Sequence, residues 1–329
     1  MVWNGAAQDL TLKNGKLRLT AAGYQPASLH KNERLPGATL DFTVTPFAVV
    51  MGTVSKDPDM VSLCRLKAEH FIDGWRDWQK RDPRVFKDTE ITDADMAKYS
   101  LLLVGGPEAN RVTSKLAAKL PLRITTDRIV IDGKEFPVKD AAVQMLYPNP
   151  PNPERYVWIA AGTSTDGMYF AGLNPQGLYD WDYIIVDGVI PAYKQKSSAL
   201  QTRIISGMFD YNWRFSETLT QAGDKEIRAK GRLRHRPKAD FAVNPKLLES
   251  YAGRYQIGEG MPVELVKDGD RLLVKQHGQA EGMELLPETE TSFYLPGYDV
   301  WISFVQDASG KVTGLIGYQN GDFEGKKLD

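Results

Sequence analysis

The sequence predicts an α/β unit followed by a separate all-β unit. Leu101–Val104 is an apolar run that ends at Gly105 and Gly106, which is typical of a strand buried on both faces of a parallel sheet. Strand-like and helix-like segments alternate over residues 46–220, which favours a doubly wound, mainly parallel sheet of the Rossmann or flavodoxin type. Beyond residue 241 the helical period ceases, and short alternating runs predict an antiparallel β barrel.

The expected boundaries divide the chain into four parts. Residues 1–45 are expected to form a β region that packs on the next domain, because Asn14-Gly15 between two alternating runs is a strong hairpin signal. Residues 46–220 form the three-layer α/β domain, residues 221–240 a basic linker or edge strand, and residues 241–329 the barrel.

Within the α/β domain, the expected elements have local signals. Asp57 and Pro58 are typical of a helix start, and the apolar stripe that follows at spacings of three and four predicts an amphipathic helix. Asp132-Gly133 predicts a hairpin. The expected strands are 46–52, 85–86, 101–104, 156–161 and 183–186, and the expected helices are 58–78, 91–98, 111–120 and 197–213.

The composition is that of a globular protein, and we expect neither a membrane nor a nucleic acid as a partner. Hydrophobic residues make up 42% and charged residues 25% of the chain, and no apolar run approaches the roughly 20 residues of a membrane helix. The formal net charge is −1, and basic residues are concentrated in Lys225–Lys238. That stretch lacks the aromatic residues on which bases stack, so we interpret it as a solvated edge strand or linker.

We expect no metal and no cofactor. The single cysteine, Cys64, lies on the apolar stripe of the first helix, which favours buried packing over a nucleophilic role. The four histidines are scattered without the spacing of metal ligands. Gly105-Gly106 is followed by neither a dinucleotide-binding pattern nor a P-loop lysine, so a plain turn is the favoured interpretation.

No catalytic residue is predicted. The nearest approach to a nucleophile elbow, G-x-S-x-G, is Gly162-Thr163-Ser164-Thr165-Asp166, in which aspartate stands in place of the second glycine. Because the strained elbow needs small neighbours, we expect Ser164 to be a helix N-cap. Ser28-Leu29-His30-Lys31 matches S-x-x-K, but Pro36-Gly37 soon afterwards excludes the long helix that this motif opens in penicillin-binding enzymes.

Two loops form the candidate binding site for a small polar ligand. One follows the central strand and the other follows strand 156–161; their candidate residues are Gly105, Gly106, Glu108 and Asn110, and Gly162, Thr163, Ser164 and Asp166. We expect both loops at one edge of the sheet, where the carboxyl ends of parallel strands meet. Helix starts favour polar groups, whereas Glu108 and Asp166 oppose a strongly anionic ligand, so a sugar or peptide fragment is favoured. The alternative is that these residues are ordinary helix caps facing solvent.

Four segments carry a family resemblance: F-A-V-V-M-G-T at 47–53, L-L-V-G-G-P-E-A-N at 102–110, K-L-P-L at 119–122 and the proline-rich L-Y-P-N-P-P-N-P-E-R-Y-V at 146–157. Through them, residues 40–215 resemble the region downstream of the catalytic domain in large bacterial prolyl-oligopeptidase-like α/β-hydrolases. That family carries its Ser-Asp-His apparatus in a separate domain. The resemblance thus implies an upstream catalytic domain as a partner, and a periplasmic or secreted location, although the start of this chain shows no signal peptide.

A second resemblance lies in the C-terminal part. It rests on L-E-S-Y-A-G-R-Y at 248–255, D-R-L-L-V at 270–274 and F-V-Q-D-A-S-G-K-V at 304–312. Residues 245–329 are similar to the lipocalin-like β domain appended to many β-lactamase-related serine hydrolases. Two functions follow as expectations. The chain is a non-catalytic accessory portion of a bacterial serine hydrolase of esterase or peptidase type, or it is a free-standing protein that binds a sugar or peptide.

Overall fold

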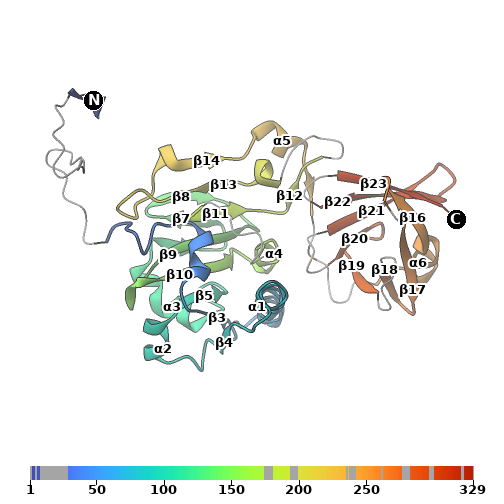
Figure 1. The fold of residues 1–329 in the computed structure, drawn as a ribbon. Coiled ribbons are helices and arrows are strands. Elements are labelled where there is room, and N and C mark those ends of the chain that lie inside the picture. The colour runs from blue at the N-terminus through green and yellow to red at the C-terminus, as the bar shows by residue number, and fades with distance from the viewer. Residues whose placement is uncertain are drawn as a thin grey trace.

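A computed structural model of the chain describes residues 29–173, 181–192, 199–234, 236, 242–260, 262–275, 282–295, 300–319 and 322–328, together with two short strands near the N-terminus. An α/β unit and a β barrel lie side by side (Figure 1). The two short strands, β1 (Val2–Trp3) and β2 (Ala6–Ala7), pair antiparallel. The hairpin expected at Asn14-Gly15 lies outside the described residues.

Residues 29–45 pack on the α/β unit, but they are not the β structure that was expected. Thr39–Val44 forms a 3-10 helix, η1, whose Phe42 is fully buried. Gly37 and Ala38 both have positive φ angles, of 98° and 68°. Two successive left-handed residues interrupt an extended backbone, which explains why no strand continues into this segment.

The α/β unit is built on one sheet of eight strands in the order β14-β13-β11-β9-β10-β5-β3-β4. Half of it is parallel, as expected for a doubly wound layer. The parallel strands are β3 (Phe47–Met51), β4 (Arg84–Lys87), β5 (Ser100–Val104) and β10 (Asn152–Gly162). The antiparallel strands are β9 (Ala142–Asn149), β11 (Tyr183–Val186), β13 (Ile205–Gly207) and β14 (Thr220–Ala222).

The sheet is therefore mixed rather than mainly parallel, and the proline-rich segment is one reason. Only Pro150 and Pro151 separate β9 from β10, and a connection this short can join only antiparallel neighbours. The pair forms a long hairpin, with an irregularity between Asn152 and Tyr156. The proline-rich segment at 146–157 thus contains the turn at which the sheet changes from parallel to antiparallel.

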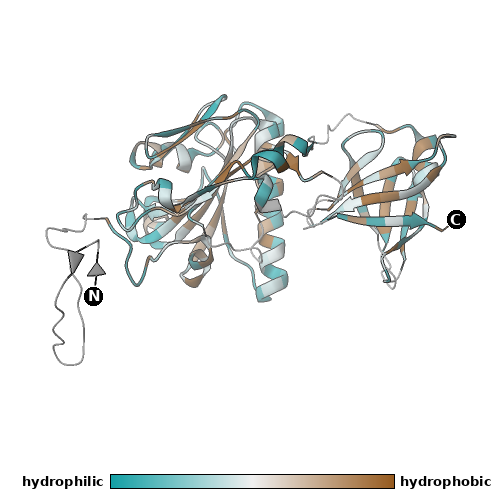
Figure 2. Cartoon of the chain, turned by 90° about the horizontal axis from the view of Figure 1, so that it is seen from above, coloured by the Kyte–Doolittle hydropathy of each residue, from teal (hydrophilic) through white to brown (hydrophobic). Residues whose placement is uncertain are grey.

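The apolar run Leu101–Val104 lies in the interior of the sheet, as expected. It belongs to β5, which is flanked by β3 and β10, and all five residues of the strand are buried. Leu101, Leu102 and Leu103 are each 0% exposed. Figure 2 shows hydrophobic residues concentrated on the strands of the sheet and barrel.

The helices surround the parallel half of the sheet. The long helix α1 (Pro58–Gln79) packs on β3 and β5 and against α4 (Thr165–Tyr169). Its start is as expected, because Asp57 accepts a hydrogen bond from the Asp59 amide and Pro58 is its first residue. On the other side of β3 and β5 lie α2 (Asp93–Lys98) and α3 (Arg111–Leu116), and a short 3-10 helix, η2 (Ala117–Lys119), follows α3 (Figure 1). This is the two-sided cover that right-handed crossovers produce.

A small three-stranded sheet lies beside this layer. Its strands are β6 (Leu122–Ile124), β7 (Arg128–Ile131) and β8 (Lys134–Pro137). The hairpin expected at Asp132-Gly133 joins β7 to β8, and both turn residues have positive φ angles, of 48° and 85°. These angles are those of a tight hairpin turn and favour Asp-Gly there.

One expectation for the region after residue 190 is wrong, and the basic stretch that follows contains a helix as well as a strand. The helix expected over 197–213 is absent from the described part, which instead contains a 3-10 helix, η3 (Ala199–Thr202), and then β13. The basic stretch begins as a helix, α5 (Lys225–Lys230), capped by Asp224, and continues into β15 (Arg232–Leu233), which pairs with β12 (Val189–Ile190). In both places contacts with distant strands, rather than local periodicity, determine the structure.

The C-terminal part is a separate closed barrel of eight antiparallel strands, as expected. Helix α6 (Pro245–Tyr251) precedes it, and the last strand pairs with the first, which closes the barrel. Tyr251 and Phe304 stack in its core with ring centroids 3.8 Å apart. Its strands are β16 (Gly253–Ile257), β17 (Val263–Asp268), β18 (Arg271–Lys275), β19 (Met283–Pro287), β20 (Ser292–Leu295), β21 (Val300–Gln306), β22 (Val312–Tyr318) and β23 (Asp322–Lys327).

Candidate functional site

A cleft of about 230 Å³ lies at the carboxyl edge of the parallel strands. Its lining includes Gly106 and Glu108 from the loop after β5, and Gly162 and Thr163 from the end of β10. The strand order reverses beside β3, because β4 lies on one side of it and β5 on the other. An open α/β sheet forms a crevice at such a point, so the two candidate loops do meet at one edge.

Four of the eight candidate residues line this cleft, and the other four make structural contacts around it. The hydroxyl groups of Ser55, Thr125 and Thr126 complete the polar part of the lining, with Met60 and Ile124 among the apolar part. Glu108 is exposed and is the one carboxylate in the lining. A cleft with hydroxyl groups and one acid suits an uncharged polar ligand better than an anion.

Asn110 is a structural residue with all its hydrogen-bonding positions in use. Its amide nitrogen donates to the carbonyl oxygens of Val50 and Val104, both at 3.1 Å. Its amide oxygen accepts from the backbone N–H groups of Val112 and Thr113, which caps α3. The side chain is fully buried and ties β3, β5 and α3 together.

Two of the glycines are required by the backbone. Gly105 has a φ of 111°, and a Cβ there would lie 3.0 Å from the sulfur of Cys64. A Cβ on Gly162 would lie 2.2 Å from the backbone nitrogen of Met168. Both positions therefore demand glycine for conformation or close packing, whether or not a ligand binds.

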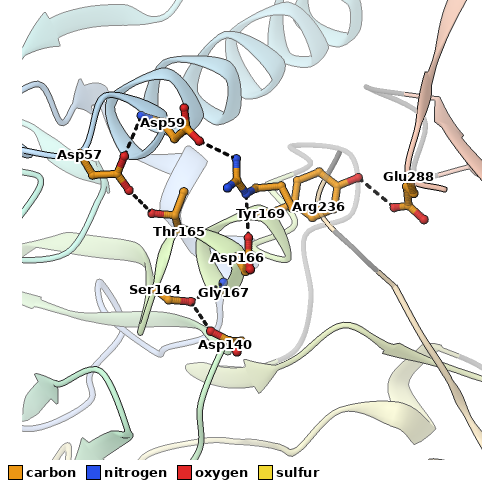
Figure 3. Close-up of polar contacts among 10 residues, drawn as sticks. All are labelled: Asp57, Asp59, Asp140, Ser164, Thr165, Asp166, Gly167, Tyr169, Arg236 and Glu288. Atoms are coloured by element: carbon orange, nitrogen blue, oxygen red, sulfur yellow. Dashed lines mark hydrogen bonds and ion pairs between the residues drawn. The ribbon is translucent and has the colours of Figure 1, made fainter. Parts of the chain in front are cut away.

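Ser164 is the N-cap of α4, as expected. Its hydroxyl accepts a hydrogen bond from the Gly167 amide at 3.0 Å and donates one to Asp140 at 2.7 Å (Figure 3). The neighbouring Thr165 hydroxyl donates to Asp57 at 2.5 Å, which connects the starts of α4 and α1. Side chains thus cap the first amide groups of α3, through Asp88 and Asn110, and the Gly167 amide of α4, through Ser164, so these amides are not available to a ligand.

Asp166 and Thr163 also make contacts within the protein. Asp166 accepts a hydrogen bond at 2.7 Å from Arg236, which also reaches Asp59 at 3.0 Å (Figure 3). Thr163 is buried, and its hydroxyl accepts from the Ala141 amide at 3.0 Å. The two remaining candidates, Gly106 and Glu108, both line the cleft. The Gly106 carbonyl accepts hydrogen bonds from the amides of Ala109 and Asn110, so the space open at this residue is that of a side chain and not of its backbone.

Cys64 is unsuited to nucleophilic chemistry. It is fully buried beside β5, and burial raises the pKa of its thiol to about 12, with a smaller contribution from the charge of Asp88. The thiolate form is therefore disfavoured at neutral pH. Across the part of the chain that the structure describes, no group of three His, Cys, Asp or Glu side chains is arranged to hold a metal ion.

None of the described helices is both long and apolar enough to span a bilayer.

A cluster between the two units was missed by sequence reasoning. The Glu288 carboxylate follows β19 of the barrel and accepts a hydrogen bond from the Tyr169 hydroxyl at 3.2 Å (Figure 3). The same carboxylate oxygen accepts a hydrogen bond from the Trp301 indole N–H, also at 3.2 Å. The Arg234 guanidinium lies 3.4 Å from the centre of a Trp301 ring, a close cation–π contact. Burial raises the pKa of Glu288 to about 7, against the opposing effect of Arg234.

No local signal could have revealed this cluster. Its members come from α4, from the segment after β15 and from the barrel. Tyr169 and Glu288, which share a hydrogen bond, are more than a hundred residues apart in the sequence. The only pointer in the sequence is the concentration of basic residues around Arg234. The structure shows that Arg228 and Arg232 of this stretch form ion pairs with Asp187 and Asp322. Arg228 and Arg232 are therefore partly buried in ion pairs, whereas Lys225 and Lys230 of the same stretch are exposed.

A comparison with known protein families gives one match. Residues 238–329 match the family described as Domain of unknown function (DUF3471), a C-terminal domain typical of β-lactamase-related hydrolases. The match covers the barrel and its approach, and it does not extend into the α/β unit. No curated protein matches the chain.

Proposed function

We propose that this chain is a non-catalytic accessory portion of a bacterial serine hydrolase of esterase or peptidase type. The observation that carries the proposal is the match of the barrel to a domain typical of β-lactamase-related hydrolases. The resemblance of residues 40–215 to the region beside prolyl-oligopeptidase-like catalytic domains supports it from the other end of the chain. A catalytic α/β-hydrolase domain is the partner that this proposal requires.

The chemistry of the candidate nucleophiles supports a non-catalytic role. The Ser164 hydroxyl is committed to its helix cap and to Asp140. These partners are a carboxylate and a backbone N–H, and neither is the imidazole that accepts the serine proton and passes it to the leaving group in a Ser-His-Asp triad. Cys64 is a buried thiol with a raised pKa.

The test of inertness uses the purified chain with p-nitrophenyl acetate and a fluorophosphonate probe. We expect no turnover above buffer and no stoichiometric labelling. Ser164→Ala serves as the matched variant. Labelling of the wild type that this variant abolishes would overturn the non-catalytic assignment.

The test of the partnership is the coding sequence upstream of Trp3 in the native gene. An α/β-hydrolase domain encoded there in the same frame supports the accessory role. A signal peptide directly before this segment would contradict it and favour the second function below.

The second candidate function is a free-standing protein that binds a small uncharged ligand, such as a sugar or a peptide fragment. The cleft at the carboxyl edge favours it, because both candidate loops line the same hollow of about 230 Å³. Gly106 has room for a larger group, since a Cβ there would lie 3.5 Å from its nearest neighbour, Ala161. The variant Gly106→Val should therefore fill part of the cleft with little damage to the fold.

Titration with short oligosaccharides and peptides, followed by amide NMR shifts, tests this second function. We expect shifts at Gly106, Glu108 and Thr125, and their loss in Gly106→Val. Shifts confined to residues beyond Tyr251 would exclude the cleft. A control variant, Gly172→Val, alters a glycine outside the cleft whose φ is not positive and where a Cβ would meet nothing within 4 Å.

A further inference from the structure

A second and larger cavity, of about 440 Å³, lies between the two units. One wall is the exposed side of α1 near its start, and the other is the end of the barrel together with α6. Cavities at domain interfaces with an apolar lining are the usual sites for small molecules. This cavity has no residue in common with the cleft at the carboxyl edge.

The floor of the cavity is hydrophobic and comes from both units. Leu272, Leu285 and Phe293 belong to the barrel core, yet each also borders the cavity. From the facing side, Leu63 and Leu66 of α1 complete the floor. Leu66 is 42% exposed, although a leucine gains free energy when it is buried. From the barrel, the partly exposed Leu286 also lines the cavity, whereas Leu63, Leu272 and Leu285 are buried behind it. A hollow that leaves apolar side chains of two units in contact with water is typical of a ligand site.

The rim of the cavity disfavours an anion. It contains the carboxylates of Asp59, Asp270 and Glu284 against the guanidinium groups of Arg236 and Arg271. Arg236 already pairs with Asp59 and Asp166, and Arg271 with Asp268 and Glu284. Each cation therefore faces two carboxylates, and an anionic ligand would have to compete with them for it.

We propose that this interdomain cavity binds a small non-anionic amphiphile, with its apolar body on the leucines and Phe293 and its polar end at the acidic rim. Because the walls belong to different units, the ligand contacts both at once. Its binding therefore stabilises the docked arrangement of the α/β unit and the barrel.

The test uses two fluorescent probes with the same apolar body. N-phenyl-1-naphthylamine is uncharged, and 8-anilino-1-naphthalenesulfonate adds a sulfonate to it. Both become bright in an apolar site, so titration of the full chain gives an affinity for each. We expect saturable binding of the uncharged probe, with an affinity about tenfold or more above that of the sulfonate.

Two tryptophan variants on α1 locate the site. Ser62 is exposed and lines the cavity, so Ser62→Trp should fill it and weaken binding of the uncharged probe by about tenfold or more. Asp77 is exposed on the same helix, about 22 Å further along its axis, and Asp77→Trp is the matched control. Both positions face solvent, so both variants should fold, which circular dichroism checks.

Three outcomes would overturn the proposal. They are equal binding by the wild type and Ser62→Trp, tighter binding of the sulfonate, and no saturable binding at all. None of them bears on the accessory role proposed above, which depends on the catalytic partner and not on this cavity.

Discussion

The hydroxyl of Tyr169 donates a 3.2 Å hydrogen bond to the carboxylate of Glu288, across the boundary between the α/β unit and the barrel. Trp301 donates to the same oxygen, and the Arg234 guanidinium stacks on the Trp301 ring. Tyr294, Trp301 and Tyr318 of the barrel belong to the hydrophobic core of the α/β unit rather than to that of the barrel. The two units thus share a packed interface with a carboxylate at its centre.

The buried carboxylate predicts a pH dependence of stability. Burial raises the pKa of folded Glu288 to about 7, above an unfolded value near 4.5. Between these values the folded state binds more protons than the unfolded state, so stability falls as pH rises from about 4.5 to about 7. The contribution of Glu288 over this window is of the order of 3 kcal/mol. Urea unfolding of the wild type and Glu288→Gln at pH 4.5, 6 and 8 measures it.

Glu288→Gln keeps an oxygen that accepts from Tyr169 and Trp301 and removes the charge, so its stability should fall less over this range. Glu284→Gln is the control, because Glu284 is an exposed carboxylate on β19 of the same barrel. The same slope in the wild type and Glu288→Gln would contradict the prediction.

We expect the ion pairs of Arg236 to make a modest, salt-dependent contribution to the free energy of unfolding. Its guanidinium joins Asp59 on α1 to Asp166 on α4, and the two carboxylates are 53% and 56% exposed. Because solvent screens such pairs, Arg236→Ala should cost only about 1 kcal/mol. The cost should shrink in 1 M salt, where the Debye length is about 3 Å. Thermal unfolding at low and high salt checks this, and a loss that salt leaves unchanged would argue that packing, not charge, is responsible.

We expect truncation of the Asn110 side chain to cause a large loss of stability. In Asn110→Ala the carbonyl groups of Val50 and Val104 lose their buried partner, and α3 loses its cap. We expect a loss of about 3 kcal/mol in the free energy of unfolding, measured with urea. Asn244→Ala is a matched control, because Asn244 caps α6 through Lys246 but is exposed, and it should cost about 1 kcal/mol. Equal losses would mean that the bridge between β3 and β5 contributes nothing beyond a cap.

We expect the loss of Lys31 to destabilise the protein at neutral pH and to do so less at low pH. Its ammonium lies 2.6 Å from Asp182, a carboxylate with a fully buried side chain. Burial raises the pKa of Asp182, and Lys31 opposes that rise. Lys31→Met leaves a buried unpaired charge and should cost about 3 to 5 kcal/mol at neutral pH. The cost should shrink as pH falls, because the folded state then takes up a proton on Asp182 at a pKa above the unfolded value.

Denaturant unfolding at pH 5 and pH 8 measures the defect of Lys31→Met. Arg34→Met is the control, because it breaks an ion pair with Glu154 in which both side chains are more than half exposed. It should cost less than about 1 kcal/mol at either pH. A defect in Lys31→Met that is independent of pH would contradict the electrostatic explanation.

Strong local signals were sufficient to predict several elements. The apolar run Leu101–Val104, the Asp57-Pro58 helix start, the Asp132-Gly133 hairpin and the Ser164 cap each depend on a few adjacent residues. The barrel was predictable for the same reason, because its short alternating strands are joined by turns at glycines such as Gly269 and Gly310. Such signals depend on backbone preferences and on the pattern of apolar residues, and both are set by residues that are adjacent in the sequence.

Other features were determined only by the tertiary structure, because they depend on contacts between residues far apart in the chain. The antiparallel half of the sheet, the strand at Ile205–Gly207 and the ion pairs of Arg228 and Arg232 all require distant partners. The same holds for the roles of Asn110 and Asp166, which the sequence left open between ligand groups and ordinary helix caps. The sequence by itself determined where strands, caps and turns form, because these are local preferences. Folding decided which side chains remain free for a ligand, because a hydrogen bond to a distant residue removes a group that its neighbours would leave available.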